Sequence, residues 1–289
     1  MADTGTTDEA DQSAANTDKS QQDSDARFSK QHILDVQIRE GLAELNRPAS
    51  GLFLSALSAG LDIGFGPLLM AVMLTVAEFS FASPLTRELL MANAYAVGFV
   101  LVILGRSELF TEHTTLAVLP VLDGQASVRQ LARLWGLVYL GNVLGAIVFA
   151  GIIAVVIPAM GVAETRAFVE IASRLTDHDW EVIVAGGVLA GWLMGLLSWL
   201  VAAAQETISR LLFVWIIATA IGFAHLPHSI AGTVEVLMGA FSSAEISFVD
   251  FLRFLVASTI GNAIGGGVFV SILKYSHVVR SVPEDEMVQ

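Results

Sequence analysis

The sequence predicts an all-α integral membrane protein, and three observations lead to that fold class. Of the 289 residues, 54% are hydrophobic and only 15% are charged, whereas soluble proteins carry about 25% charged residues. Three stretches without a charged side chain, residues 134–163, 182–205 and 254–273, are each long enough for a helix to cross a bilayer. Two further apolar stretches are interrupted by polar segments. Single buried core helices do not explain such a pattern.

The N-terminal segment, residues 1–30, is expected to be a disordered acidic tail. Residues 1–27 hold seven acidic side chains against Lys19 and Arg27, and almost no large apolar ones. Such a segment cannot bury enough apolar surface to offset its ordering entropy. A cleavable signal peptide is not expected, because it would have a basic start followed by an apolar core.

A short amphipathic helix is predicted for residues 31–48, ending at Pro48. Its apolar residues recur at steps of four, four and three, and so share one face. They are Leu34, Ile38, Leu42 and Leu45. The helix could lie on the membrane surface or pack against the transmembrane helices.

The transmembrane domain, residues 49–276, is expected to contain six spans. These lie near residues 51–77, 89–122, 134–157, 182–205, 211–240 and 254–275. Six spans place both termini on one side, which collects ten Lys and Arg residues; the other side holds Arg87, Arg166, Arg174 and Arg253. By the positive-inside rule, both termini, including the tail 277–289, are predicted to face the cytoplasm from the inner membrane.

Spans two and five are predicted to be broken inside the membrane, at residues 105–115 and 225–235, which begin 120 positions apart. The interruptions follow uncharged runs of 17 residues (89–105) and 14 residues (211–224). As helices these runs extend about 21 to 26 Å, less than a hydrocarbon core of about 30 Å. A matched pair of broken spans is typical of a substrate path at the membrane midplane, so the pattern predicts a transporter or channel.

The chain also contains an internal repeat. Gly141-Asn142 in span three recurs as Gly261-Asn262 in span six, again 120 residues later. The same offset pairs Glu108 with His228. Two units of three spans each insert in opposite orientations, so the fold is expected to consist of two inverted three-helix repeats. The glycines of the repeat are expected to allow close helix packing rather than to carry chemistry.

Four segments resemble motifs of the formate/nitrite transporter family. They are Glu108-Leu109-Phe110-Thr111, residues 135–142, Gly222-Phe223 followed by residues 228–231, and Gly261-Asn262 followed by Gly265-Gly266-Gly267. The resemblance covers residues 50–275, and residues 106–114 resemble a divergent branch. It implies an aquaporin-like six-span bundle and a homopentamer with one pore in each protomer. The implied substrates are small monovalent anions of weak acids, such as formate, nitrite, hydrosulfide or lactate.

The resemblance also implies roles for individual residues. Leu109, Phe110 and Thr111 would form the loop that breaks span two and one apolar constriction. His228 would be the central pore histidine of span five. Arg174 is the nearest candidate for the basic residue that the family carries before span four.

The chain departs from the family pattern at several positions. Two asparagines of the family are replaced by Gly191 and Gly232. Three extra residues separate Phe223 from His228, so His225 is an alternative for the central histidine. Arg106 stands where the family usually has a small residue.

A weak-acid anion avoids much of the cost of crossing hydrocarbon by taking up a proton. That route requires an electropositive vestibule, a dry constriction and a group that can exchange a proton. Arg106 and Arg174 could attract the anion. Candidates for the constriction are Leu109, Phe110 and Phe223. His228 could exchange the proton, because histidine has a reference pKa of about 6.5.

Several of these residues also have simpler explanations. Arg106 and Glu108 could neutralise each other, because charges inside a membrane usually pair. Thr111 could satisfy backbone groups freed by the break. Glu235 could complement Arg106 or His113. His228 could be a structural donor, although a position in a broken span favours function.

No metal, cofactor or enzymatic activity is expected. The chain has no cysteine, and its histidines lack the spacing of a zinc-binding helix. Neither a nucleophile elbow nor a phosphate-binding loop is found. The expected partners are a small monovalent anion or its conjugate acid, the lipid bilayer and further copies of the chain; no nucleic acid is expected.

Two other functions stay open at this point. The glycines at 191 and 232 could have removed anion selectivity, which would give an aquaporin-like channel for small neutral solutes. The acidic tail could instead recruit a partner to a membrane sensor or scaffold.

Overall fold

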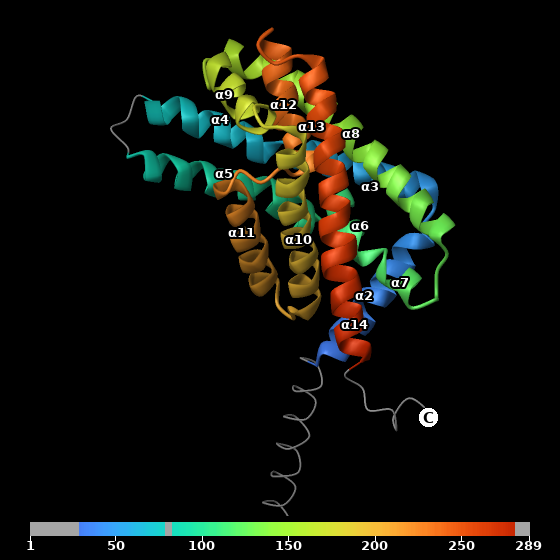
Figure 1. Ribbon diagram of the computed structural model, residues 1–289. Helices are drawn as coiled ribbons and strands as arrows, with labels where there is room; N and C mark the ends of the chain where they lie inside the picture. Colours follow the sequence, from blue (N-terminus) through green and yellow to red (C-terminus); the bar gives the residue numbers. More distant parts are fainter. Residues whose placement is uncertain (1–28, 79–82, 281–289) are drawn as a thin grey trace, which may run out of the picture.

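The computed structural model describes residues 29–78 and 83–280, and within these residues all regular secondary structure is helical (Figure 1). Most of the two predicted tails, residues 1–28 and 281–289, lies outside the described residues. Along the chain the helices are α2 Lys30–Leu45, α3 Ala49–Asp62, α4 Phe65–Glu78, α5 Pro84–Gly105, α6 Phe110–Leu116, α7 Leu119–Leu122, α8 Val128–Ala159, α9 Thr165–Thr176, α10 Trp180–Ala203, α11 Thr207–Phe223, α12 Ser229–Ser242, α13 Phe248–Ile264, the π-helix η1 Gly265–Ile272 and α14 Leu273–Val279.

Five helical segments of the described chain are long and apolar enough to cross a membrane. They are Ala49–Val76, Pro84–Gly105, Val128–Ala159, Trp180–Ala203 and Phe248–Val279. The predicted fifth span consists of two shorter apolar helices, α11 and α12. Span two ends its first helix at Gly105 and resumes at Phe110. The structure therefore has both predicted breaks, and the all-helical membrane fold is confirmed.

Helices α8 and α13 begin six residues before the spans predicted at 134 and 254. Each starts with a capping box. The serine side chain accepts a hydrogen bond from the backbone N–H of the third helical residue, and the side chain of that residue accepts one from the backbone N–H of the serine. The caps are Ser127 with Gln130 and Ser247 with Asp250, again 120 residues apart. The uncharged runs alone could not locate these starts, because each helix begins before its uncharged run, in a segment that contains arginine.

The repeated glycines lie where two pairs of helices cross. A Cβ on Gly145 of α8 would lie 2.4 Å from the carbonyl oxygen of Leu57 in α3. A Cβ on Gly265 would lie 2.2 Å from the carbonyl oxygen of Val188 in α10. These glycines therefore set the close approach of α8 to α3 and of the sixth span to α10, as predicted.

Helix α2 packs against the helix bundle. Its buried residues Ile33, Leu34 and Ile38 form a small core with Trp199 of α10 and Val278 of α14. The Gln37 side chain donates to the carbonyl oxygen of Ser198 at 2.9 Å. The first and last described helices consequently lie together at one end of the molecule, while α9 lies at the opposite end (Figure 1).

Two features of the fold were not predicted from the sequence. Helix α9 forms between spans three and four, where a loop was expected. Its buried residues, Ala167, Phe168, Ile171, Ala172 and Leu175, lie on one face. In addition, α13 continues through the π-helix η1, where Gly266 lies against α6: a Cβ there would lie 2.1 Å from Thr114 Oγ1. The short helix α6 is thus fixed directly against the backbone of the sixth span.

Candidate functional site

An asparagine from a neighbouring helix holds the first break. Asn142 of α8 accepts a hydrogen bond from the backbone N–H of Phe110 at 2.8 Å. Its amide group donates to the carbonyl oxygens of Ala56 and Glu108, each at 2.8 Å. Asn142 is fully buried, and its bonds to Phe110 and Glu108 satisfy backbone groups that the interrupted helix leaves unpaired, while its bond to Ala56 ties the break to α3.

The second break is held in the same way by Asn262 of α13. Asn262 accepts from the backbone N–H of Ser229 at 2.8 Å and donates to the carbonyl oxygens of Gly187 and Pro227 at 2.9 Å. The two asparagines belong to the repeated Gly-Asn pair. The repeat therefore carries the bonding that makes both breaks possible.

The backbones of the two breaks also match, but with an offset of 119 rather than 120 residues. Arg106 and His225 both adopt left-handed conformations, with φ of 55° and 49°. Leu109 and His228 are the N-caps of α6 and α12, both with φ of −103°. The predicted pairing of Glu108 with His228 is therefore wrong: His228 corresponds to Leu109. Leu109 lies 33 positions before Asn142, whereas His228 lies 34 positions before Asn262. This one extra residue changes the offset between the two halves from 120 at the asparagines to 119 at the breaks.

His228 lies at the centre of the molecule, with 1% of its surface exposed. Its Nδ1 accepts a hydrogen bond from the backbone N–H of Ala231 at 3.1 Å. A neutral ring then carries its proton on Nε2, which donates to Thr111 Oγ1 at 2.7 Å. The Thr111 hydroxyl remains able to donate to another group. We call this His228–Thr111 pair the central contact; it joins the two breaks.

Of the residues predicted to form a constriction, Leu109 and Phe110 are buried but Phe223 is not. The ring of Phe110 packs edge-on against Trp135 and Tyr139 of α8, at centroid distances of 5.8 and 5.0 Å. Phe223 is 43% exposed, because α11 turns Ile221 and Gly222 inward and Phe223 outward. The aromatic side chain that contacts the His228 ring is instead Phe99 of α5, edge-on at 5.0 Å.

Glu108 belongs to a buried charged network. Its Oε1 accepts from Arg47 Nη1 and its Oε2 from His113 Nε2, both at 2.5 Å. Arg47 also donates to Glu44 at 2.8 Å, and the bond to Glu44 together with that to Glu108 raises the pKa of Arg47. The predicted pairing of Arg106 with Glu108 is wrong. Arg106 has a left-handed backbone conformation and is exposed, and Glu108 binds Arg47 and His113 instead.

A cavity of about 310 Å³, the proximal vestibule, opens on the side of the described termini. Its charged lining residues are Glu40, Glu44, Arg106, Glu108, Glu112 and Arg210. Four carboxyl groups thus face two guanidinium groups. The expectation of an electropositive vestibule around Arg106 is contradicted on this side. Helices α2 and α6, whose glutamates could not be placed from the sequence, supply three of the carboxyl groups, and the loop before α6 supplies the fourth, that of Glu108.

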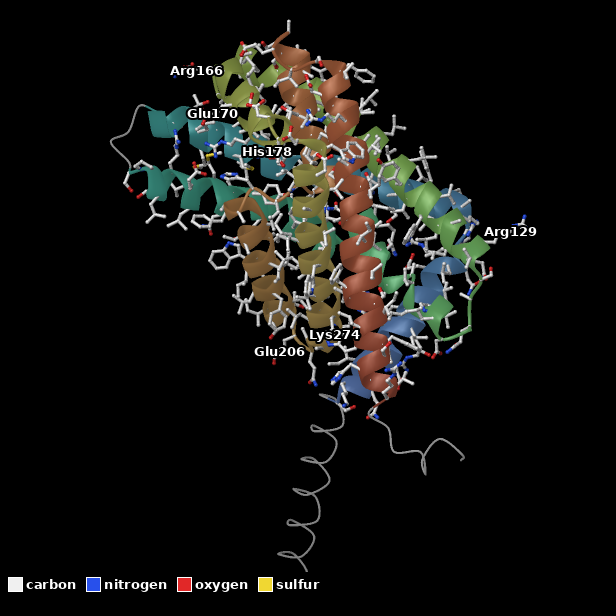
Figure 2. All side chains as sticks on the ribbon, viewed as in Figure 1. Arg129, Arg166, Glu170, His178, Glu206 and Lys274 are labelled. Carbon is white, nitrogen blue, oxygen red and sulfur yellow. The ribbon has the colours of Figure 1, made fainter. Side chains whose placement is uncertain are left out.

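A second cavity, the distal vestibule of about 590 Å³, is lined by Glu88, Glu170, Ser173, Arg174, Asp177, His178 and His225. Figure 2 shows Glu170 and His178 at one end of the bundle and Glu206 and Lys274 at the other. Arg174 donates to Glu88 at 2.9 Å and to Glu170 at 2.8 Å. Burial alone would lower the pKa of Arg174, but these hydrogen bonds outweigh it and raise the pKa.

His225 lies in the distal vestibule rather than at the centre. Its Nε2 is 3.1 Å from a carboxylate oxygen of Glu88 and 3.3 Å from Arg174 Nη1. A third of its side chain is exposed, whereas His228 is enclosed. The two candidates for the central histidine therefore lie in different places: His225 in the distal vestibule and His228 in the buried central contact.

The vestibules lie at two levels along α5. Ile103 and Leu104 line the proximal vestibule, while Tyr95 lines a narrow cavity that also contains Arg174 and His225 of the distal vestibule. Tyr95 and Ile103 are eight positions apart along α5, which corresponds to about 12 Å at 1.5 Å per residue. Phe99, which contacts His228, lies between these levels. The central contact thus lies between the two vestibules.

Some residues of the vestibules and of the network beside them were not predicted as site residues. Glu88 and Arg47 are charged residues next to the ends of predicted spans, and that position was the available signal for them. Glu170 lies at least twelve positions from either neighbouring span and had no such signal. Phe99 carries no such signal, because it is one of 16 phenylalanines and lies inside an uncharged run.

Gly191 and Gly232 face neighbouring helices. A Cβ on Gly191 would lie 2.2 Å from the carbonyl oxygen of Asn262, where α10 crosses α13. A Cβ on Gly232 would lie 2.3 Å from the ring of Phe254. Both positions require glycine for helix packing, so they do not bear on the selectivity of a pore.

Comparison with known proteins identifies the family. The family model described as formate/nitrite transporter matches residues 31–276. The chain belongs to the formate/nitrite transporter family. Family members are transporters and channels, so the chain is a multi-pass membrane transport protein and not an enzyme, as expected.

Individual members of the formate/nitrite transporter family match most of the chain. The inner membrane protein YfdC of Escherichia coli (strain K12) is 33% identical over 267 residues, covering 90% of this chain and 82% of that protein. The nitrite transporter NirC of the same organism is 25% identical over 224 residues, covering 77% and 81%. A solved pentameric formate channel with formate bound superposes with a TM-score of 0.69 at 25% identity, covering 80% and 98%.

Proposed function

We propose that this protein passes a small monovalent weak-acid anion of the formate or nitrite kind, together with a proton, across the inner membrane. The observation that carries the proposal is the central contact, a buried His228–Thr111 pair that joins two broken spans between two vestibules. An imidazole and a hydroxyl can bind and release a proton or a small polar solute. The relatives that transport nitrite and formate support the substrate class.

The charges along the route favour passage of the neutral acid. The central contact holds no carboxylate or guanidinium group, so a bare anion would meet only the His228 ring and the Thr111 hydroxyl there. Both vestibules contain more carboxyl than guanidinium groups. An anion is costly to place in such surroundings, and uptake of a proton removes that cost.

Each predicted site residue except Phe223, which is exposed, receives a role on this proposal. His228 and Thr111 contact the substrate at the centre, and Leu109 and Phe110 fix the loop that presents Thr111. Arg174 and His225 receive the anion in the distal vestibule. Arg106 lines the proximal vestibule. Glu108 also lines it and binds Arg47 and His113, which braces the first break.

The remaining assignments concern the membrane and the assembly. We place both termini in the cytoplasm, because the side of the termini collects the excess of Lys and Arg. We take the two halves as inverted repeats, since both breaks share one bonding pattern and each half has three spans. The pentameric relative supports a homopentamer with one route in each protomer.

The alternative of a channel for neutral solutes is not favoured. Its motivation was the loss of two asparagines, but Gly191 and Gly232 are packing positions. Family relatives transport anions of weak acids.

Purified protein in liposomes tests the proposal. Formate or nitrite flux is expected to rise as pH falls, while osmotic swelling shows little water or glycerol permeability. Absence of flux for every small weak acid, from mildly acidic to mildly basic pH, would refute the proposal. Deletion of residues 1–27 is expected to leave this flux unchanged, whereas a scaffold that acts through the tail would lose its partner.

A further inference from the structure

Glu235 is a buried carboxyl group on the substrate route that has no role in the function described above. It lies on α12, two turns after His228, and is 6% exposed. Arg106 and His113, which could have complemented it, lie elsewhere, in the proximal vestibule and its network. Glu235 instead lines the narrow cavity together with Tyr95, Arg174 and His225.

The narrow cavity lies between the distal vestibule and the central contact. Arg174 and His225 line both the cavity and the vestibule. On the other side, the Tyr95 ring packs 5.1 Å from that of Phe99, which in turn packs against His228. The cavity measures about 10 Å³, which is about the space that one water molecule needs. A solute moving from the vestibule to the centre therefore passes beside Glu235.

Charge balance for Arg174 does not explain this glutamate. Arg174 already donates to two carboxylates, at 2.9 Å to Glu88 and 2.8 Å to Glu170. A third permanent negative charge at this depth would be costly and would repel an entering anion. Carboxyl groups inside membrane proteins commonly mark proton routes, because they can exist in a neutral, protonated form.

We infer that Glu235 donates the proton that neutralises the anion before it reaches the central contact. This inference rests on the proposed function and adds a proton donor to it. The O–H bond of the Glu235 carboxylic acid breaks as an O–H bond forms on the anion, and the neutral acid moves on toward His228. The Glu235 carboxylate left behind then takes a proton from water of the distal vestibule. In the opposite direction of transport the same steps run in reverse.

The groups around Glu235 suit both of its states. Arg174 from α9 is the cation nearest to the cavity and stabilises the carboxylate after proton release. Tyr95 from α5 and His225 from the loop before α12 are the other titratable groups of the lining. Because Glu88 and Glu170 hold Arg174 in place, the guanidinium group stays beside Glu235 during the cycle.

The test is Glu235→Gln in liposomes, with labelled formate and an internal pH dye read over a range of pH. The variant keeps the side-chain size but cannot donate an acidic proton. Formate flux is expected to fall by at least about tenfold and to lose its rise at low pH. Unchanged flux with an unchanged pH profile would overturn the inference.

Two matched variants separate proton donation from charge balance. Glu170→Gln removes a carboxylate from Arg174 outside the cavity and is expected to change the formate concentration for half-maximal flux, with the pH profile preserved. Glu181→Gln, at an exposed position at the start of α10, is expected to behave as the wild type. Equal loss of pH dependence in the Glu170 and Glu235 variants would assign Glu235 to charge balance only.

Glu235→Asp keeps the inference testable if the Gln variant does not assemble. The shorter carboxylic acid is expected to retain pH-dependent flux at a lower rate with a shifted midpoint, and an unshifted midpoint with a wild-type rate would overturn the inference. A wild-type protein without any weak-acid flux would refute the proposed function itself. Wild-type flux combined with an unaffected Gln variant would refute only the role of Glu235.

Discussion

The two breaks in the membrane spans have the same backbone but different side chains. Each has a left-handed residue, an extended N-cap and an asparagine bonded to the loop on both sides. The first break then adds charges, because Glu108 binds Arg47 and His113. The second has Pro227 in the position of Glu108, and its N-cap His228 accepts a backbone hydrogen bond and contacts Thr111.

This comparison separates the parts that make a break from the parts that use it. The asparagines do the same work in both halves, and no charge is needed for it. The charged network braces the first break only, next to the proximal vestibule. The uncharged second break supplies the imidazole of the central contact. Changes in the shared parts should therefore affect both halves equally, while changes in the other parts should have different effects in the two halves.

The largest expected effect is that of replacing either asparagine. Asn142→Leu and Asn262→Leu each remove three hydrogen bonds and leave buried backbone groups unpaired. Two of these groups belong to the break itself, and at about 1–3 kcal/mol for each unpaired group either variant should lose about 2–6 kcal/mol of stability, a large part of the stability of a typical domain. Thermal unfolding in detergent and recovery of assembled protein measure this.

Asn93→Leu is the control for both variants, because Asn93 is only half-buried and holds no break; it accepts from Trp215 at 2.9 Å and donates to the carbonyl oxygen of Leu89 at 2.7 Å. It should lose less than about 1 kcal/mol. If one of the buried asparagines proved as tolerant as Asn93, the two breaks would not share a common support.

Replacement of His228 should lower the rate of transport and leave its pH dependence in place. His228→Asn keeps a polar group of similar size but loses the imidazole that contacts Thr111, so formate flux should fall at every pH, while it still rises as pH falls because Glu235 supplies the proton. The oligomer should remain intact by size-exclusion chromatography, because the second break keeps its asparagine. Flux in liposomes at several pH values measures the effect.

His225→Asn is the matched variant in the same loop and should have the weaker effect. His225 contacts Glu88 in the distal vestibule and makes no contact with Thr111. The opposite ranking, with His225→Asn lowering the flux strongly and His228→Asn silent, would move the substrate-binding centre into the vestibule.

Much of this arrangement could be predicted from the sequence, for reasons visible in particular residues. Uncharged runs too short to cross a bilayer located both breaks, and the Gly-Asn repeat located the helix crossings. The one-residue shift between Glu108 and Leu109 could not be predicted, because it depends on turn geometry that leaves no mark in a residue pattern. The partner of Glu108 was also missed, since Arg47 lies 61 positions away in the chain and reaches the break only after α2 docks.

Glu108→Gln should destabilise the first break by a smaller amount than loss of its asparagine. The substitution leaves Arg47 and His113 without their shared carboxylate, and charged hydrogen bonds of this kind contribute about 1.5–3 kcal/mol each. The Glu108 side chain is 11% exposed, so partial screening by water should limit the loss to about 2–3 kcal/mol. Chemical unfolding in detergent measures it.

Glu44→Gln serves as the comparison, because it removes only the more exposed contact of Arg47 and leaves the bond to Glu108. A loss of at most about 1 kcal/mol is expected. Equal losses in the two variants would show that the buried network does not brace the first break, and the contrast between the breaks would then rest on His228 alone.

The smallest expected effect concerns the contact between the two long helices α8 and α13. Tyr139 Oη lies 3.0 Å from Thr259 Oγ1, and these residues are 120 positions apart. Such a contact is expected if the two halves are related as the proposed inverted repeats. Tyr139→Phe and Thr259→Val should each lose about 0.5–1.5 kcal/mol, and the double variant should lose less than their sum, because the same hydrogen bond is removed twice. Strict additivity in this double-mutant cycle would show that the pair does not couple the halves, and the relation between them would then depend on the asparagines and glycines of the repeat.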